Sequence, residues 1–233
     1  MTTKEQLVLA CPTVSVGVLT ADLLNLGGEL AVLEQAGVPL VHIDVMDGVF
    51  CPQMTVGPGF IKALKTPLLK DVHLMIADPV DKLESFVAAG ADIVTVHAET
   101  PHVHRSLQAL GKMTNVNDPA RGIVRGLGLN PGTPLSAVEP VIDELEMVVL
   151  LAVNPGFPAQ SFIDATAARV EQLIEIINRS GRDVIVCVDG GIKKDNVKAV
   201  AAMGADLVVT GSAVFDGKAA PANAAFMLEA VRS

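Results

Sequence analysis

The chain has 233 residues, of which 50% are hydrophobic and 18% are charged, so it is a globular chain and not a disordered one. Its net charge of −9, without a cluster of lysine and arginine, argues against a nucleic-acid surface, although backbone N–H groups would still bind one phosphate. No run approaches about 18 uncharged apolar residues and no basic segment precedes one, so we expect neither a membrane span nor a signal peptide. Three widely spaced cysteines favour free thiols in a reducing compartment such as the cytoplasm.

Apolar, β-branched runs alternate along the chain with helical patterns. Residues 22–37 and 167–181 carry apolar residues at three- and four-residue spacing, and the second stretch ends on Gly181, as helices often do. Eight strands, each followed by a helix, predict one α/β domain over residues 1–233, a (β/α)8 or TIM barrel with about 29 residues per unit. An open doubly wound sheet is the alternative, but no GxGxxG follows the first run. The strand-like runs lie at residues 7–11, 40–45, 69–76, 92–98, 122–129, 147–153, 183–189 and 206–211.

A Gly-Ala-Asp motif precedes two of these runs, in AAGADIVTVHA and AMGADLVVTGS. The two glycines, Gly90 and Gly204, are separated by close to half of the chain. This spacing indicates two halves of four units each. The other interpretation is that Gly-Ala-Asp is simply a common helix-to-strand turn, and the sequence leaves both open.

Polar side chains interrupt the apolar run VHIDVMDGVF at residues 41–50. Because side chains alternate across a strand, His42 and Asp44 share one face with Met46, and Ile43 and Val45 share the other. The same alternation applies to two other predicted strands. It places Asp71, His73 and Met75 on one face of the strand at residues 69–76, and Cys187 and Asp189 on one face of the strand at residues 183–189.

These polar faces are expected to point into the barrel near the carboxyl ends of the strands, where barrel enzymes place their chemistry. An unpaired buried carboxylate costs at least several kcal/mol, so Asp44 and Asp189 need partners. Together with His42 and His73 they would suit a divalent metal ion. The alternative is that the histidines are satisfied core residues and the aspartates cap loops. The role of His97, on the following strand, stays open.

Glycine-containing loops follow the last three strands: NPGFPAQ at 154–160, DGGI at 189–192 and TGSA at 210–213. Barrels often bind phosphate with the loops after strands seven and eight, where glycine lets the backbone approach the ligand. One such dipeptide is more often a plain turn. Two of them at these strand ends predict an anion site.

In these motifs the chain resembles the ribulose-phosphate 3-epimerase family. The resemblance covers residues 19–215, in order, and HIDVMDG with DVHLM is its most specific part. It implies a (β/α)8 barrel, one divalent metal ion (Zn, Fe(II), Mn or Co), self-association and a small sugar phosphate as ligand. The implied reaction inverts C3 of a ketopentose 5-phosphate, D-ribulose 5-phosphate to D-xylulose 5-phosphate, through an enediolate that the metal stabilises.

The resemblance also assigns roles residue by residue. It implies Asp44 and Asp189 as the acid/base pair and, with His42 and His73, as metal ligands. It implies Met46 and Met75 as residues that line the intermediate, although plain core filling explains them equally well. The implied substrate and phosphate contacts are His73, Gly156, Phe157, Pro158, Ala159, Gly190, Gly191, Gly211 and Ser212.

The first departure from the family pattern is a missing serine. The family's PSILSAD, aligned without gaps onto VGVLTAD, places its substrate-binding serine at Gly17. Thr13 or Ser15 would substitute only if the strand were shifted or bulged.

Three further departures concern residues that the resemblance places in other motifs of the family. A lining methionine becomes Leu151, and a histidine in DGHF becomes Val49. GFGGQ becomes GFPAQ, where Pro158 has no N–H to donate and Ala159 disfavours positive φ. This last change weakens one wall of the implied phosphate site or adapts it to another ligand.

The departures leave other functions open. The substrate could be a different keto-sugar phosphate, such as a hexulose 6-phosphate or a tetrulose phosphate. A non-catalytic barrel that binds a sugar phosphate is the alternative of another class. A decarboxylase of the related barrel superfamily fits less well, because its Asp-x-Lys-x-x-Asp triad has no counterpart in HIDVMDG.

Overall fold

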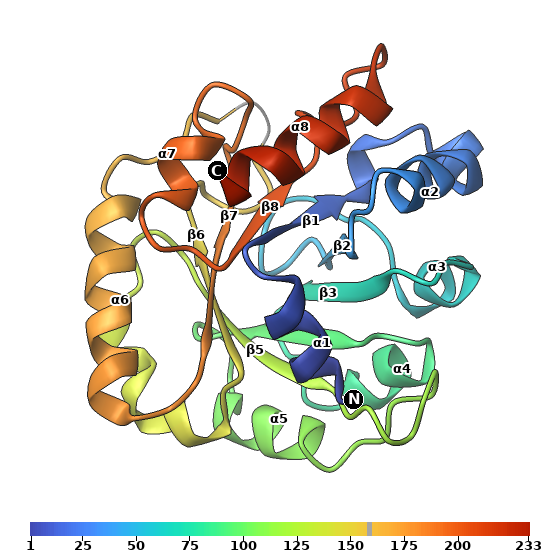
Figure 1. Ribbon diagram of the computed structural model, residues 1–233. Coiled ribbons are helices and arrows are strands. Elements are labelled where there is room, and N and C mark those ends of the chain that lie inside the picture. Colours follow the sequence, from blue (N-terminus) through green and yellow to red (C-terminus); the bar gives the residue numbers. More distant parts are fainter. Residues whose placement is uncertain (158–159) are drawn as a thin grey trace.

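The strands close into a barrel in which every strand is parallel to its neighbours, as predicted. The computed structural model describes residues 1–157 and 160–233, and Figure 1 shows the helices on the outside of the strands. The order around the barrel follows the chain, and β8 closes on β1. The strands are β1 (Thr13–Gly17), β2 (Leu40–Met46), β3 (Leu69–Met75), β4 (Ile93–His97), β5 (Val124–Leu129), β6 (Met147–Leu151), β7 (Ile185–Asp189) and β8 (Leu207–Thr210).

Helices connect the strands, with one exception. Between β5 and β6 the described chain forms the short 3-10 segments η3 (Leu135–Ala137) and η4 (Glu139–Glu144), not the predicted α-helix. Two further 3-10 turns, η1 (Val18–Thr20) and η2 (Leu23–Asn25), follow β1. The α-helices are α1 (Thr3–Ala10), α2 (Leu26–Gln35), α3 (Pro58–Ala63), α4 (Leu83–Ala88), α5 (Val103–Leu110), α6 (Thr166–Ser180), α7 (Val197–Ala201) and α8 (Ala220–Arg232). None of them is long and apolar enough to cross a membrane.

The predicted first strand at residues 7–11 is wrong, because this segment belongs to helix α1. Thr2 starts the helix with a capping box, in which its hydroxyl accepts from Glu5 N–H and the Glu5 carboxylate accepts from Thr2 N–H. The apolar run buries Leu7 but leaves Leu9 75% exposed. Leu7 packs with the inward-facing residues of the barrel, and α1 lies across one opening of the barrel in Figure 1. The helix therefore closes the amino-terminal end of the barrel.

The predicted alternation of faces along the strands is confirmed. Ile43, Val45, Val72 and Val186 belong to the apolar layer between strands and helices. A second, smaller cluster fills the barrel below the polar residues. Its inward-facing members are Leu40, Leu69, Ile93, Val124, Met147, Val149, Leu151, Ile185, Cys187, Leu207 and Val209.

The two Gly-Ala-Asp motifs adopt the same local geometry. Gly90 and Gly204 have φ of +101° and +98°, a conformation that favours glycine. Asp92 Oδ2 accepts from the N–H of Lys70 at 2.9 Å, and Asp206 Oδ2 accepts from the N–H of Val186 at 2.8 Å. In each half of the barrel the aspartate thus ties the start of its strand to the preceding strand.

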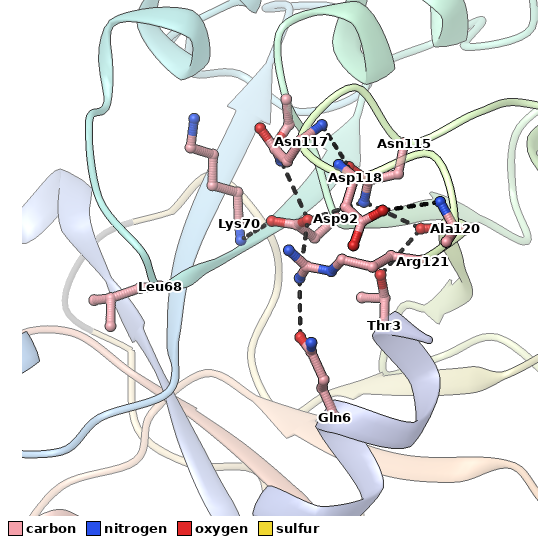
Figure 2. A network of polar contacts seen from close by, with 12 residues as sticks. Thr3, Gln6, Leu68, Lys70, Asp92, Asn115, Asn117, Asp118, Ala120 and Arg121 are labelled. Carbon is pink, nitrogen blue, oxygen red and sulfur yellow. Dashed lines mark hydrogen bonds and ion pairs between the residues drawn. The ribbon is translucent and has the colours of Figure 1, made fainter. Parts of the chain in front are cut away.

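Figure 2 shows Asp92 within a larger polar network near the amino-terminal end of the barrel. Its Oδ1 accepts from the side-chain amides of Asn115 at 2.9 Å and Asn117 at 3.2 Å, and lies 3.4 Å from Arg121 Nη2. Arg121 also donates to Gln6 Oε1 at 3.0 Å, which joins the network to α1. Both oxygens of this buried carboxylate are therefore satisfied.

Candidate active site

Four inward-facing residues from three strands converge at the carboxyl end of the barrel. His42 and Asp44 lie on β2, His73 lies on β3 directly beside Asp44 in the strand register, and Asp189 ends β7. One donor atom from each residue lies within 4.8 Å of the other three. The structure thus brings together the four residues that the strand pattern selected.

The spacing of these four atoms fits a tetrahedral ion. His42 Nε2 lies 3.2 Å from Asp44 Oδ1 and 3.7 Å from Asp189 Oδ2. His73 Nδ1 lies 3.4 Å and 3.3 Å from the same two oxygens. Ligands that each bind an ion at about 2.1 Å would be separated by about 3.4 Å in a tetrahedron. The cluster can therefore hold a divalent metal ion without rearrangement of the strands.

The histidine ligand atoms are available for such an ion. His73 Nδ1 is buried and has no hydrogen-bond partner among the residues that the structure describes. His42 Nδ1 contacts Asp71 Oδ2 at 2.7 Å, which orients the ring so that Nε2 points into the cluster. Asp71 Oδ2 also accepts from the Ser15 hydroxyl at 2.9 Å. A carboxylate that accepts from the far nitrogen of an imidazole commonly orients a metal-binding histidine.

The charges of the cluster shift the pKa values of its members. Burial lowers the pKa of His73, but the carboxylates of Asp189 and Asp44 outweigh it and raise the pKa to about 9. Burial acts the same way on His42, and Asp71 and Asp44 raise its pKa well above the ordinary value. Burial raises the pKa of Asp44, but His42 and His73 lower it below its ordinary range. A divalent cation would take the place of the histidine protons.

The two aspartates differ from the two histidines in their access to solvent. The side chains of Asp44 and Asp189 are 29% and 13% exposed, whereas those of His42 and His73 are 1% and 0% exposed. Both aspartates line a cavity of about 660 Å³ at the carboxyl end of the barrel. A bound small molecule would therefore meet the carboxylates, with the histidines beneath them.

The predicted lining and phosphate residues surround the same cavity. Met46, Met75 and Leu151 line it near the aspartates, and Gly17 lines it from β1. The predicted loop residues that line it are Gly156, Phe157, Gly190, Gly191, Gly211 and Ser212. Pro158 and Ala159 lie outside the described residues.

The glycines after β7 are required by local geometry. Gly190 and Gly191 have φ of +101° and +68°, and a Cβ on Gly191 would lie 2.8 Å from the backbone N of Phe162. These positions bring bare backbone against the cavity, which is the arrangement that an anion-binding loop needs.

The regular register of β1 decides the position of its polar residues. Gly17 pairs with His42, and Val16 pairs with both Val41 and Thr210, so the strand is neither shifted nor bulged. Ser15 is buried one layer below the cavity, against Asp71. Neither Ser15 nor Thr13, at the start of the strand, replaces the serine that is absent at Gly17.

Other polar residues have structural roles that the sequence pattern did not show. Asp47 accepts from the N–H groups of Val49, Phe50 and Ala77, and these bonds lower its pKa against the effect of burial. It therefore shapes the loop after β2. Val49 is 77% exposed on that loop, beside a neighbouring hollow.

Strand pairing did not predict two further polar residues at the cavity. Lys193 follows the DGGI loop and is one of the described residues that line the cavity, where it supplies a positive charge. Gln160 accepts from Asn154 N–H and donates to Phe157 O, which braces the loop after β6. Their signal in the sequence was only their proximity to the glycine loops.

Comparisons with known proteins show the family to which this chain is similar. A family model described as the ribulose-phosphate 3 epimerase family matches residues 13–215. Ribulose-phosphate 3-epimerase of Bacillus subtilis (strain 168) is 40% identical over 206 residues, which cover 87% of this chain and 91% of the relative. The protein of the same name from Escherichia coli (strain K12) is 42% identical over 206 residues, which cover 85% and 87%.

A solved structure shares the fold. The crystal structure of 3-hexulose-6-phosphate synthase from Salmonella typhimurium has a TM-score of 0.65 with this chain. The match covers 94% of this chain and 98% of that chain, at 18% sequence identity. At this identity the likeness shows the barrel fold alone.

Proposed function

Because the chain belongs to the ribulose-phosphate 3-epimerase family, whose members are isomerase-class epimerases, we propose that it interconverts D-ribulose 5-phosphate and D-xylulose 5-phosphate. The observation that carries the proposal is the position of Asp44 and Asp189, which line one cavity above two buried histidines. The family resemblance covers both of the strands that supply these carboxylates.

Epimerisation at C3 requires two proton transfers. The C3 proton lies α to the C2 carbonyl, so its removal gives a planar enediolate. Inversion then needs a proton donor on the opposite face. Asp44 comes from β2 and Asp189 from β7, so each carboxylate can serve one face of a substrate between them. One acts as base and the other as acid, and the roles exchange in the reverse direction.

The four-residue cluster would hold the metal ion of this reaction through His42 Nε2, His73 Nδ1, Asp44 Oδ1 and Asp189 Oδ2. When bound, a divalent ion supplies positive charge that stabilises the developing negative charge on the substrate oxygens. Two imidazoles and two carboxylates suit Zn, Fe(II), Mn or Co. Met46 and Met75 would exclude water from the plane of the enediolate.

The phosphate group would lie at the other side of the cavity. Gly190, Gly191, Gly211 and Ser212 would supply backbone N–H donors, and Lys193 would supply a positive charge. Gly156 and Phe157 would form the adjacent wall. Next in the sequence is Pro158, which has no N–H to donate where the family pattern has glycine. We propose that the lysine offsets this lost donor.

A proton NMR experiment in D2O tests the proposal. Metal-free protein is reloaded with Zn, Mn, Co or Fe(II) and mixed with D-ribulose 5-phosphate. We expect deuterium at C3 together with xylulose 5-phosphate. No exchange at C3 with any metal would contradict this substrate assignment.

A different keto-sugar phosphate is the second candidate, and a specific observation favours it. Gly17 replaces a substrate-binding serine of the family pattern, and the regular register of β1 offers no substitute. The same exchange assay with a hexulose 6-phosphate and a tetrulose phosphate distinguishes the candidates. Binding of all three sugars without exchange would favour the non-catalytic barrel.

Cellular context and assembly are also part of the proposal. Cys11, Cys51 and Cys187 are free thiols in the described structure, which supports a reducing compartment such as the cytoplasm. Self-association follows from the family resemblance. The exposed Leu24, Met54 and Phe157 around the carboxyl end of the barrel offer apolar surface that an assembly would cover.

A further inference from the structure

A second imidazole lies directly behind His73. His73 Nε2 and His97 Nε2 are 2.8 Å apart, and the two ring planes are within 10° of parallel. His97 is fully buried on β4, and Phe50 packs against its ring at a centroid distance of 4.6 Å. At this distance one proton lies between the two nitrogens, so one ring donates and the other accepts.

Glu99 determines which ring donates. His97 Nδ1 lies 2.8 Å from Glu99 Oε2, and an ionised carboxylate only accepts hydrogen bonds. Nδ1 of His97 therefore carries a proton, and in the neutral ring its Nε2 has the lone pair. His73 must then donate from Nε2, which leaves the lone pair of His73 on Nδ1, the atom that faces Asp44 and Asp189.

Glu99 is itself fixed by the loop after β5. Its Oε1 accepts from the N–H of Asn130 at 2.8 Å and from the hydroxyl of Thr133. Burial raises the pKa of Glu99, but His97 and Thr133 outweigh it and lower the pKa to about 2. The carboxylate is thus held in its acceptor form at one position.

Strand β5 makes room for this arrangement. A Cβ on Gly128 would lie 3.0 Å from His97 Nε2, so glycine at this inward position admits the full imidazole ring. His42 has a simpler support, because Asp71 contacts it directly. The two histidines are therefore oriented differently. A carboxylate contacts His42 directly, whereas the carboxylate of Glu99 acts on His73 through the ring of His97.

We propose that His97 and Glu99 are positioning residues, which hold His73 in the tautomer protonated at Nε2 and so direct its Nδ1 lone pair toward the metal ion. This inference rests on the proposed function, since it concerns the metal site of that reaction. Neither residue is among the described residues that line the main cavity, so they act through His73 and not on the substrate.

Metal affinity tests the inference separately from turnover. Metal-free wild type and variants are titrated with Co(II) and Zn(II) against a competing chelator, and the visible spectrum of bound Co(II) is recorded. We expect His97→Phe, which keeps the ring volume but accepts nothing, to weaken metal binding about 10- to 100-fold. Glu99→Gln should weaken it less. His97→Gln, whose amide oxygen can accept from His73, should restore part of the affinity.

Thr95→Val is the matched control. Thr95 is the preceding inward residue of β4, is equally buried, and its hydroxyl has no hydrogen-bond partner within the described structure. This variant should bind the metal as wild type does. Equal affinity and equal Co(II) spectra in wild type and His97→Phe would overturn the inference. Failure of wild type to bind any metal would instead overturn the metal site of the proposed function.

Histidine-selective 15N NMR of the zinc-loaded wild type needs no variant. The inference requires that His73 show a protonated Nε2 and a metal-bound Nδ1, and that His97 show a protonated Nδ1. The opposite tautomer at His73 would overturn it even if every variant failed to fold.

Discussion

The two ends of the barrel each bury a cluster of polar side chains around an aspartate, and the clusters differ in what their atoms face. At the amino-terminal end, Asp92 accepts from Lys70, Asn115 and Asn117 and pairs with Arg121. At the carboxyl end, His73 Nδ1 has no hydrogen-bond partner within the described residues. The first cluster is satisfied internally, whereas the second has ligand atoms that could hold a metal ion.

Buried polar side chains can either stabilise the fold or bind a ligand, and the two clusters differ in this respect. A satisfied cluster contributes stability and takes no ligand, because its hydrogen-bonding capacity is already used. In the second cluster the histidine nitrogens that face the carboxylates can exchange their protons for a cation, which would then stabilise the folded chain. Substitutions at the carboxyl end should therefore change kcat and metal binding, and those at the amino-terminal end only stability.

The largest effect is expected at the carboxyl end. Asp44→Asn and Asp189→Asn should each lower kcat at least about 10³-fold, because each removes one carboxylate of the proposed two-base scheme. Their unfolding midpoints in urea, measured near pH 7 without metal, should fall, because each variant removes a carboxylate that pairs with a buried histidine and raises its pKa. Steady-state kinetics with urea titration checks both. An active Asp189→Asn variant would refute the two-base scheme.

At the amino-terminal end we expect a loss of stability without a loss of kcat. Asp92→Ala should lower the free energy of unfolding by about 3 kcal/mol, because it leaves the amides of Asn115 and Asn117 and the charge of Arg121 without their acceptor. The kcat of the folded fraction should not change. Asp206→Ala is the control from the other half of the barrel. It loses the contact to Val186 N–H and should cost only about 1 kcal/mol.

Lys193 offers a smaller effect within the cavity. Lys193→Ala should raise KM for a phosphorylated substrate about tenfold with little change in kcat, because a charge contact of this kind is worth about 1.4 kcal/mol. Lys194→Ala is the matched control, since its Nζ donates to Asn223. An equal rise in KM for both variants would indicate a general charge effect and not a phosphate contact.

A further expected effect is a change in the pH dependence of stability. Glu99 has a pKa of about 2 in the folded chain and an ordinary value of 4.5. Its stabilising contribution is therefore complete above about pH 5 and is lost as the pH falls toward 2, because the unfolded chain takes up the proton first. Urea titrations of the metal-free protein should show a flatter profile for Glu99→Gln than for wild type over this range. Parallel profiles would show that Glu99 is not held as described.

The sequence predicted the barrel and the four converging residues for one physical reason. His42, Asp44, His73 and Asp189 all lie on strands, where a period of two fixes the face of each side chain. Seven of the eight predicted strands lie where the structure has them, and the apolar outer face of each made the polar inner face visible.

What the sequence did not predict depends on contacts between distant segments. The run at residues 7–11 has the composition of a strand, but Thr2 and Glu5 cap it as a helix and one side chain, Leu7, closes the barrel. The contact between His73 and His97 depends on how two strands and their side chains pack, which parity alone does not give. Alternation along the strand left open whether His97 belongs to the site or to the core.

The glycines of β5 have a consequence for related chains. Gly126 and Gly128 face into the barrel opposite Thr95 and His97. A Cβ at position 126 would collide with the Thr95 hydroxyl, and a Cβ at position 128 would lie 3.0 Å from His97 Nε2, which is a tight contact. Side chains from neighbouring strands fill the same layer inside a barrel. The volume that the β5 glycines leave empty is therefore available to the side chains of β4. Positions 97 and 128 should therefore covary in an alignment of the family, with an imidazole at one only where the other has no side chain. The composition of β5, which supplies none of the four clustered residues, would then depend on the residue that supports His73 from β4.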